Sequence, residues 1–164
     1  MTIFIKNKYT LQIDEFKFRC CIGKKGSTKH KKEGDKKTPI GTFEIENIYF
    51  RKDRKIKPLT LLKCVEIKNN MGWCDDTRFP KKYNKLFKIE KKIKYEKLRR
   101  KDSKYDFLIP IKYNFKKPVT GLGSCIFIHL TKDYKPTAGC IALKEKDFLI
   151  MAKLIKKNSK IKIF

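Results

Sequence analysis

A histidine and a cysteine eleven residues apart are the side chains of this sequence best suited to chemistry. His129 ends an apolar, β-like run that begins at Ile126, and Cys140 follows Gly139 at the start of a second apolar run that reaches Leu143. A thiol is a weak nucleophile until a base takes its proton, and an imidazole is the usual base. The chain has 2 histidines, so few other Cys–His pairs exist. The pair predicts nucleophilic catalysis by Cys140 with His129 as its base.

The residues around Cys140 bear on the alternative interpretation, a buried cysteine and a core histidine, which the spacing also fits. Gly139 leaves the backbone accessible beside the sulfur, and glycine allows conformations in which successive N–H groups converge on an oxyanion. The segment 134–137 is predicted as a loop, so His129 and Cys140 lie at strand ends, where a cleft can form. The other histidine, His30, lies in a lysine-rich loop with no cysteine nearby.

The elements that must position this pair are mostly short strands. Alternating apolar side chains and turn signals predict strands at 2–6, 9–14, 16–22, 42–50, 61–67, 105–113 and 124–130. A short basic helix is predicted at 87–100 and an amphipathic helix at 144–157, and 161–164 can close the sheet. This order predicts one β-dominated domain that spans residues 1–164.

Length and composition favour a folded domain. A chain of 164 residues can bury a core, and 40% apolar with 12% aromatic residues argues against disorder. No apolar run approaches the roughly 20 residues of a membrane span. The first residues alternate like a strand and lack the pattern of a secretory signal. We therefore expect a soluble protein without a visible export address.

The charge of +26 invites a nucleic-acid interpretation, but its distribution argues against one. Most of the 43 basic residues are lysines, and they cluster in no single block. We interpret them mainly as solvated lysine background, and we expect no specific nucleic-acid partner. The alternative is a functional anion-binding surface for nucleic acid, an acidic wall polymer or lipid headgroups.

The 6 cysteines do not form a metal-binding pattern. None of them makes a Cys-x-x-Cys motif, so the usual spacing of a structural zinc site is missing. Cys20 and Cys125 lie in apolar, strand-like runs and are predicted to behave as small buried hydrophobes. Free thiols are the default expectation for a chain of this length.

A second segment, residues 33–43, completes a resemblance. The chain resembles the L,D-transpeptidase catalytic domain, also called the YkuD domain. That family carries an Asp-x-x-Thr-Pro-x-Gly-x-Phe stretch, which matches Asp35, Thr38, Pro39, Gly41 and Phe43. It also carries a histidine upstream of Gly-Cys-Ile-x-Leu, which matches His129 and residues 139–143. The stretches 72–76, 113–114 and 121–124 look like a compact, single-domain branch of the family.

Two positions depart from the family pattern. Most members have Ser-His-Gly-Cys, whereas this chain has Ala138 in place of that second histidine. Most members have an arginine two residues after the cysteine, where this chain has Ala142. An arginine fork would grip a carboxylate, so we expect another cation to take this role. The basic loops offer Lys24, Lys25 and Lys132 for it.

The resemblance implies a fold, a reaction and roles for individual residues. The fold would be a β-sandwich with a small helical element and one C-terminal helix. The reaction would be acyl transfer between peptidoglycan stem peptides through a thioester on Cys140. The backbone at Gly139 and Cys140 would stabilise the oxyanion, Thr137 would orient the imidazole or the substrate, and Ala142 and Tyr134 would lie at the substrate. No metal or organic cofactor is expected, and the protein is expected to be a monomer.

Two rival functions stay open at this point. In the first, water resolves the same acyl-enzyme, which makes a cell-wall peptidase or amidase. In the second, the protein is a basic module that binds nucleic acid or a wall polymer, and its binding weakens steeply with salt. The implied substrate places the protein in the periplasm or cell envelope, and the missing signal leaves the cytoplasm open.

Overall fold

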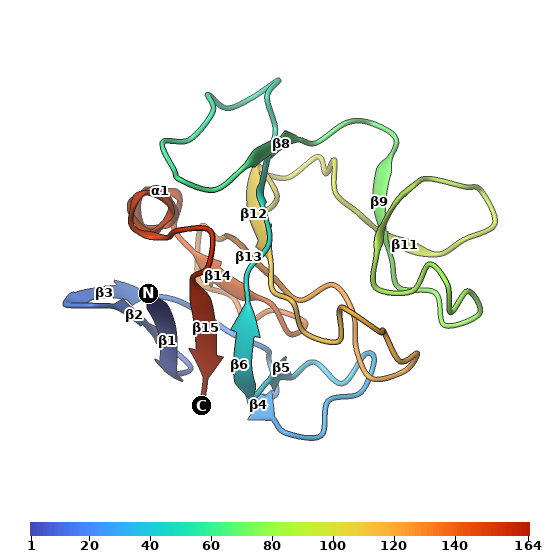
Figure 1. Cartoon of the computed structure of the whole chain (residues 1–164), viewed down its shortest axis with the longest axis horizontal. Helices are drawn as coiled ribbons and strands as arrows, with labels where there is room; N and C mark the ends of the chain where they lie inside the picture. Colours follow the sequence, from blue (N-terminus) through green and yellow to red (C-terminus); the bar gives the residue numbers. More distant parts are fainter.

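Two five-stranded sheets face each other across the main hydrophobic core (Figure 1). The computed structural model describes all residues from 1 to 164. The first sheet consists of β1 (Thr2–Asn7), β2 (Thr10–Ile13), β3 (Phe16–Arg19), β6 (Gly41–Glu44) and β15 (Lys160–Ile163). Its order is β3-β2-β1-β15-β6, and β1 pairs in parallel with β15. The first and last strands of the chain therefore lie side by side within this sheet.

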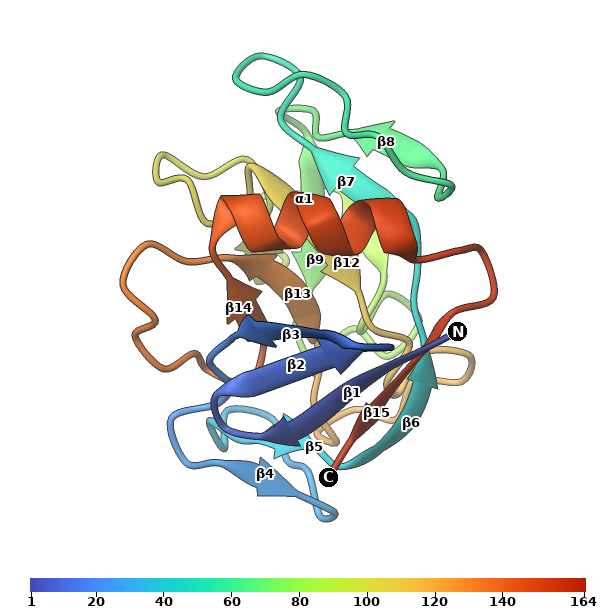
Figure 2. The ribbon, with the colours of Figure 1, turned by 90° about the vertical axis from the view of Figure 1, so that its left-hand side faces the viewer.

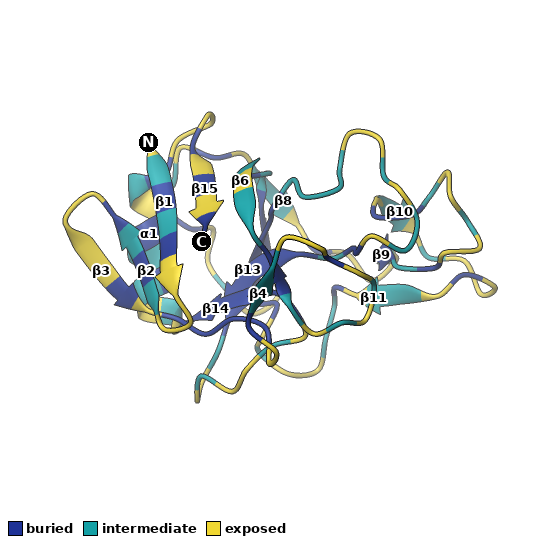
Figure 3. Ribbon diagram, turned by 90° about the horizontal axis from the view of Figure 1, so that it is seen from below, coloured by how far each residue is buried: buried dark blue, intermediate teal, exposed yellow.

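The second sheet is buried on both faces except at its edge strand β8. It consists of β7 (Ile48–Phe50), β8 (Cys64–Glu66), β12 (Phe107–Pro110), β13 (Phe127–Leu130) and β14 (Ile141–Leu143), in the order β14-β13-β12-β7-β8. Every residue of β12, β13 and β14 is buried, and Figure 3 shows β13 and β14 in the interior. Such strands have continuous apolar runs because both of their faces are covered.

One face of the second sheet meets the first sheet and the helix α1 (Glu145–Leu154), which runs alongside the sheets (Figure 2). Phe148, Met151 and Ala152 are the buried residues of α1, and their spacing places them on one side of a helix. The ring of Phe148 stacks on that of Phe107 at a centroid distance of 5.8 Å. No helix of the structure has the length and apolarity needed to cross a bilayer.

The other face of the second sheet meets a smaller sheet and forms a second apolar cluster. The smaller sheet has β9 (Met71–Cys74) between β10 (Leu86–Lys88) and β11 (Tyr95–Lys97). Trp73 of β9 packs its indole edge-to-face on Phe127 of β13, with ring centroids 5.2 Å apart. Cys140 belongs to this second cluster. The short parallel strands β4 (Ser27–Thr28) and β5 (Thr38–Pro39) complete the fold.

The mainly β architecture with a helix near the C-terminus is confirmed, but the predicted strand at 42–50 is wrong as one element. Burial alternates only over β6, and the chain then leaves the first sheet and enters the second sheet at β7, where every residue is buried. Between them, Ile45 makes an isolated bridge to Ile111. Alternation in the sequence indicates an extended chain, and it does not report which strand is the partner.

The predicted helix at 87–100 is also wrong. β10 and β11 occupy this segment, and both pair antiparallel with β9. Gly72 of β9 makes room for this arrangement, because a Cβ there would lie 2.8 Å from the Tyr95 ring. Pairing with a strand distant in sequence overrides the weak helical periodicity of the segment. The predicted strands at 16–22, 61–67, 105–113 and 124–130 exist but are shorter than expected.

Candidate active site

Strand alternation directs His129 away from the main core. In β13, Ile128 and Leu130 face the first sheet and α1, whereas Phe127 belongs to the second cluster on the opposite face. His129 lies on the same face as Phe127, because successive side chains of a strand point to opposite sides. The parallel register pairs His129 with Ala142 of β14. Cys140 lies two residues before Ala142, so the sequence pattern places it on this face as well.

A cleft of about 490 Å³ opens over this face and contains both predicted catalytic residues. Its wall comes from residues within 31–34, 96–105 and 124–142, together with Asp75. Cys140, His129, Gly139, Thr137 and Ala142 all lie in this wall, as does Ala138. The structure therefore brings together five of the six predicted site residues; Tyr134 is the exception.

Cys140 is held as a neutral thiol in the floor of the cleft. Its Sγ donates a hydrogen bond to the Cys125 carbonyl at 3.1 Å and accepts one from the Phe127 N–H at 3.4 Å. The residue is 9% exposed. Burial raises the pKa of the thiol to about 12, because a thiolate would lose its hydration. No hydrogen bond joins Cys140 to His129, so the thiol must turn away from Cys125 before it can donate a proton to the ring.

His129 is held as a neutral base. Its Nδ1 lies 2.9 Å from the Leu130 carbonyl, which can only accept a hydrogen bond, so Nδ1 carries the proton and Nε2 keeps a free lone pair. The Tyr105 ring packs edge-to-face against the imidazole at 5.3 Å. The Tyr105 hydroxyl donates in turn to Glu96 at 2.9 Å. Burial lowers the pKa of His129 to about 4, so the ring is unprotonated and able to accept a proton near neutral pH.

The two motif segments meet at Gly139. The buried Thr38 hydroxyl donates to the Gly139 carbonyl at 2.9 Å and accepts from the Gly23 N–H at 2.9 Å. Gly139 has φ +142°, and a Cβ there would lie 2.8 Å from the Lys37 carbonyl oxygen. Any other residue at 139 would therefore be strained and would push the Thr38 segment away. The Thr-Pro motif thus fixes the backbone that presents Cys140.

Thr137 stabilises the same turn. Its hydroxyl donates to the Cys140 carbonyl at 2.6 Å and accepts from the Gly139 N–H at 3.1 Å. The expected orienting contact of Thr137 with the imidazole is absent, because its hydroxyl is used by the backbone. The Gly139 N–H is also occupied by this bond. The Cys140 N–H donates to no group in the protein, so it is the member of the predicted oxyanion pair that is free for a substrate.

Asn84, which no sequence pattern indicated, holds the part of the cleft wall that contains Cys125. Its side-chain oxygen accepts from the Trp73 indole at 3.0 Å and from the Cys125 N–H at 3.1 Å. Its amide nitrogen donates to the carbonyls of Tyr113 and Asn114 at 3.0 and 2.7 Å. Trp73, Tyr113 and Asn114 belong to the stretches 72–76 and 113–114 that resemble the family, and Cys125 directly follows the third stretch, 121–124. One buried amide therefore joins them.

Cys125 differs in part from the expectation of a small buried hydrophobe within a strand. It packs against the second apolar cluster, as expected of a hydrophobe, but it is only partly buried, precedes β13, has φ +55° and lines the cleft. Its carbonyl is the acceptor that holds the Cys140 thiol. Cys20 is fully buried in the main core, as predicted.

The cations of the cleft are not the lysines that the sequence suggested. Lys24, Lys25 and Lys132 are exposed and lie outside the cleft wall. The cleft instead contains four other cations, which are Lys31, Arg100, Lys104 and Lys135.

Three of these four cations are already engaged. Lys31 is 6% exposed and pairs with Asp35 at 2.6 Å. Arg100 makes two bonds to Asp102, at 2.9 and 2.7 Å, and Lys135 pairs with Asp133 at 3.1 Å. Lys104 is exposed and takes part in none of the ion pairs of the structure.

Tyr134 is the predicted site residue that the structure places elsewhere. Its ring lies 4.4 Å from the Arg19 guanidinium and 5.6 Å from the Lys144 ammonium, and it does not line the cleft. These contacts fasten the 131–138 loop to β3 and to the start of α1. Tyr134 therefore supports the loop, and its contact with a substrate stays a prediction.

The family model for the L,D-transpeptidase catalytic domain, YkuD, matches residues 2–163. The chain belongs to this family. Its members are cysteine-dependent enzymes of peptidoglycan chemistry. No curated protein and no solved structure matches the chain significantly.

Most members of this L,D-transpeptidase family have an arginine where this chain has Ala142, and the structure shows which space that arginine would fill. Ala142 stands beside His129 in the parallel register and lines the cleft, so an arginine at this position would extend into the same space. The short Ala142 side chain leaves room next to the imidazole. No group of three or more His, Cys, Asp or Glu side chains is arranged to hold a metal ion.

The bridge at Thr38 generates a first prediction. Thr38→Val keeps the shape of the side chain but leaves the buried Gly23 N–H and Gly139 carbonyl without their partner. We expect the free energy of unfolding to fall by about 1–3 kcal/mol, measured by urea denaturation. Thr38→Ser restores the hydroxyl and should recover most of this loss. A Thr38→Val protein as stable as the wild type would contradict the role of the bridge.

Burial of His129 generates a second prediction. The ordinary histidine pKa of 6.5 applies to the unfolded chain and about 4 to the folded one, so the unfolded state holds more protons between these pH values. Stability should therefore fall as pH decreases from 6.5 towards 4, by up to roughly 3 kcal/mol from this residue. His129→Gln should show a smaller fall over this window, measured by urea denaturation at several pH values. The exposed His30 supplies the control, since His30→Gln should keep the wild-type dependence.

Proposed function

We propose that this protein is a peptidoglycan L,D-transpeptidase that cross-links stem peptides through a thioester on Cys140. The observation that carries the proposal is the common cleft of Cys140 and His129 in a chain that belongs to this family. A peptidoglycan substrate would place the enzyme in the cell envelope.

The first half-reaction forms the acyl-enzyme. The Cys140 thiol leaves the Cys125 carbonyl and transfers its proton to Nε2 of His129 as Sγ attacks the carbonyl carbon before the D-residue of a donor stem. Burial favours the neutral forms of both groups, so a stable ion pair does not form before the substrate arrives. The free Cys140 N–H is suited to stabilise the oxyanion. His129 then returns the proton to the departing amine, and the D-residue leaves.

The second half-reaction transfers the acyl group. The side-chain amine of an acceptor stem attacks the thioester carbonyl, and Nε2 of His129 accepts a proton from this nitrogen. The carbon–sulfur bond breaks, the amide cross-link remains, and the proton restores the Cys140 thiol. Tyr105, packed on the imidazole, keeps the ring oriented through both steps. Attack by water in place of the amine would release a free carboxylate and would make the protein a peptidase.

The catalytic roles lead to a third prediction. Cys140→Ala should abolish both thioester formation and cross-linking while leaving the thermal transition close to that of the wild type. His129→Ala should lower the rate of acylation by roughly 10²–10⁴, the usual contribution of a general base. Acylation is measured by intact mass spectrometry with a carbapenem, and cross-linking by product analysis with purified donor and acceptor stems.

Matched controls separate catalysis from folding. Cys20 is fully buried in the main core, so Cys20→Ala should lower stability and keep the acylation rate. His30→Ala should change neither. Acylation of the Cys140→Ala protein would refute the proposed nucleophile. Release of a hydrolysed stem with no cross-linked product would assign the peptidase reaction.

The free cation in the cleft wall leads to a fourth prediction. Lys104 is available for a stem carboxylate, so Lys104→Gln should raise KM about two- to fivefold for donors with a free terminal carboxylate. Amidated donors should be used equally well by both proteins. Lys132→Gln is the matched control, because Lys132 is exposed but lies outside the cleft wall. An equal effect of both substitutions would show that general charge, and not this position, attracts the substrate.

A further inference from the structure

The loop between β7 and β8, residues 51–63, carries the densest group of exposed aliphatic side chains in the molecule. Ile56 is 91% exposed, Leu59 72% and Leu61 69%. Three of the nine exposed large hydrophobic residues of the chain thus lie within six positions. Single exposed hydrophobes are ordinary, whereas a contiguous group marks an interaction site.

The fold holds these side chains outward. Leu62 is buried in the main core, and Pro58 is buried as well, so the residues on either side of them face solvent. Arg54 donates to the carbonyls of Asp102 and Lys101, both at 3.0 Å. Lys55 pairs with Glu145 of α1 at 2.7 Å. The loop is therefore fastened at both ends and in its middle, and its apolar residues are not free to fold back on the protein.

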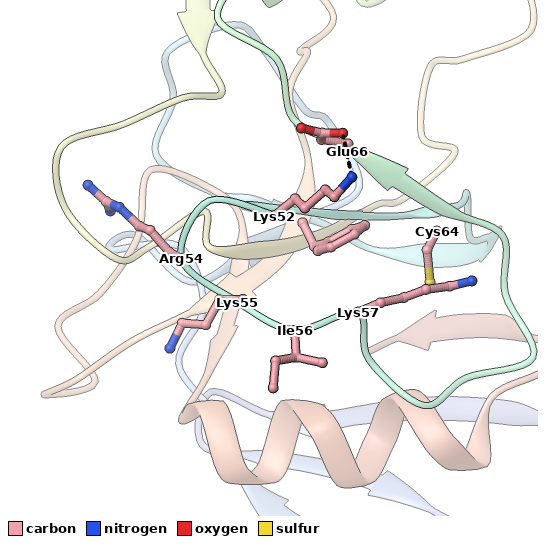
Figure 4. Close-up of a pocket in the computed structure, with 8 residues that line it drawn as sticks. Lys52, Arg54, Lys55, Ile56, Lys57, Cys64 and Glu66 are labelled. Atoms are coloured by element: carbon pink, nitrogen blue, oxygen red, sulfur yellow. Dashed lines mark ion pairs between the residues drawn. The ribbon is translucent and has the colours of Figure 1, made fainter.

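Cations and hollows surround the apolar residues. Figure 4 shows Lys52, Arg54, Lys55 and Lys57 around Ile56, at a hollow of about 620 Å³ that also includes Cys64 and Glu66. A second hollow of about 460 Å³ lies on the α1 side of the loop, with Leu59, Leu149 and Lys153 in its wall.

Arg51, Arg54 and Lys55 of this loop are engaged in ion pairs, but other cations in and beside the loop are available to a partner. Lys57, Lys63 and Lys153 are exposed and take part in no ion pair of the structure. Lys52 reaches Glu66 only at 3.9 Å.

We propose that this loop surface docks on a membrane that contains anionic lipids. Ile56, Leu59 and Leu61 enter the boundary between headgroups and acyl chains, while the surrounding lysines contact the headgroup phosphates. A nucleic acid or an acidic polymer would use the cations but would leave the three aliphatic side chains in water. An anionic lipid surface satisfies both features, because interfacial binding combines apolar burial with attraction of basic residues.

Docking in this way orients the catalytic cleft. Arg54 ties the loop to residues 101–102, and the adjoining Arg100 and Lys104 line the cleft. The cleft rim would therefore lie close to the lipid surface. The docking itself requires no reaction, so it stands or falls independently of the transpeptidase proposal.

Sedimentation with lipid vesicles tests the docking. The full chain is mixed with phosphatidylcholine vesicles, with or without phosphatidylglycerol, and the bound fraction is measured. We expect binding to the anionic vesicles alone, and Ile56→Ser/Leu61→Ser should weaken it about tenfold or more. The matched control is Val119→Ser/Leu122→Ser, which removes two exposed aliphatic residues elsewhere and should bind as the wild type does.

Each contrary outcome overturns the proposal. Absence of binding to anionic vesicles would exclude the surface as a membrane contact. Equal binding by both double variants would mean that net charge alone attracts the protein. A concentration-dependent dimer that only Ile56→Ser/Leu61→Ser abolishes, seen by light scattering, would assign the surface to a second copy of the chain. Circular dichroism of every variant checks that the fold is retained.

Discussion

The Thr38 hydroxyl is the contact on which the candidate site depends. It joins the Gly23 N–H and the Gly139 carbonyl, two backbone groups from segments far apart in the sequence. Because Gly139 adjoins Cys140, the proposed nucleophile, this one hydroxyl sets the position of Cys140 relative to the rest of the sandwich. A threonine followed by proline suits this task, since the hydroxyl supplies both a donor and an acceptor and the proline fixes the backbone.

Burial gives the site its chemical character. Both Cys140 and His129 are neutral in the free protein because the apolar second cluster and the Tyr105 ring exclude water from them. A neutral thiol resists adventitious oxidation and alkylation, which act on thiolates. In the proposed mechanism, the same burial makes proton transfer depend on the arrival of a substrate, because a thiolate and an imidazolium are both disfavoured in the free site. The two residues therefore combine low intrinsic reactivity with a geometry suited to one reaction.

Local patterns predicted what depends on local structure. The early strands, α1 and the placement of His129 and Cys140 at strand ends all follow from periodicity and from glycine positions. The predictions for segments 42–50 and 87–100 are wrong because the identity of a strand's partner is a long-range property. The same limit applies to the cleft wall. Lys31 and Arg100 lie in it because the chain folds back on itself, and they are too far from Cys140 in the sequence for a local motif to indicate them.

The parallel pairing of β1 with β15 constrains how the molecule acquires its structure. β15 lies between β1 and β6, so the first sheet cannot close until the final strand has been synthesised. Until then, the edges of β1 and β6 carry unpaired backbone groups that can pair with another chain. Such long-range closure is typically slow. A chaperone that shields these edges would therefore protect the nascent protein during synthesis. Removal of the residues of β15 would leave β1 and β6 without their shared partner.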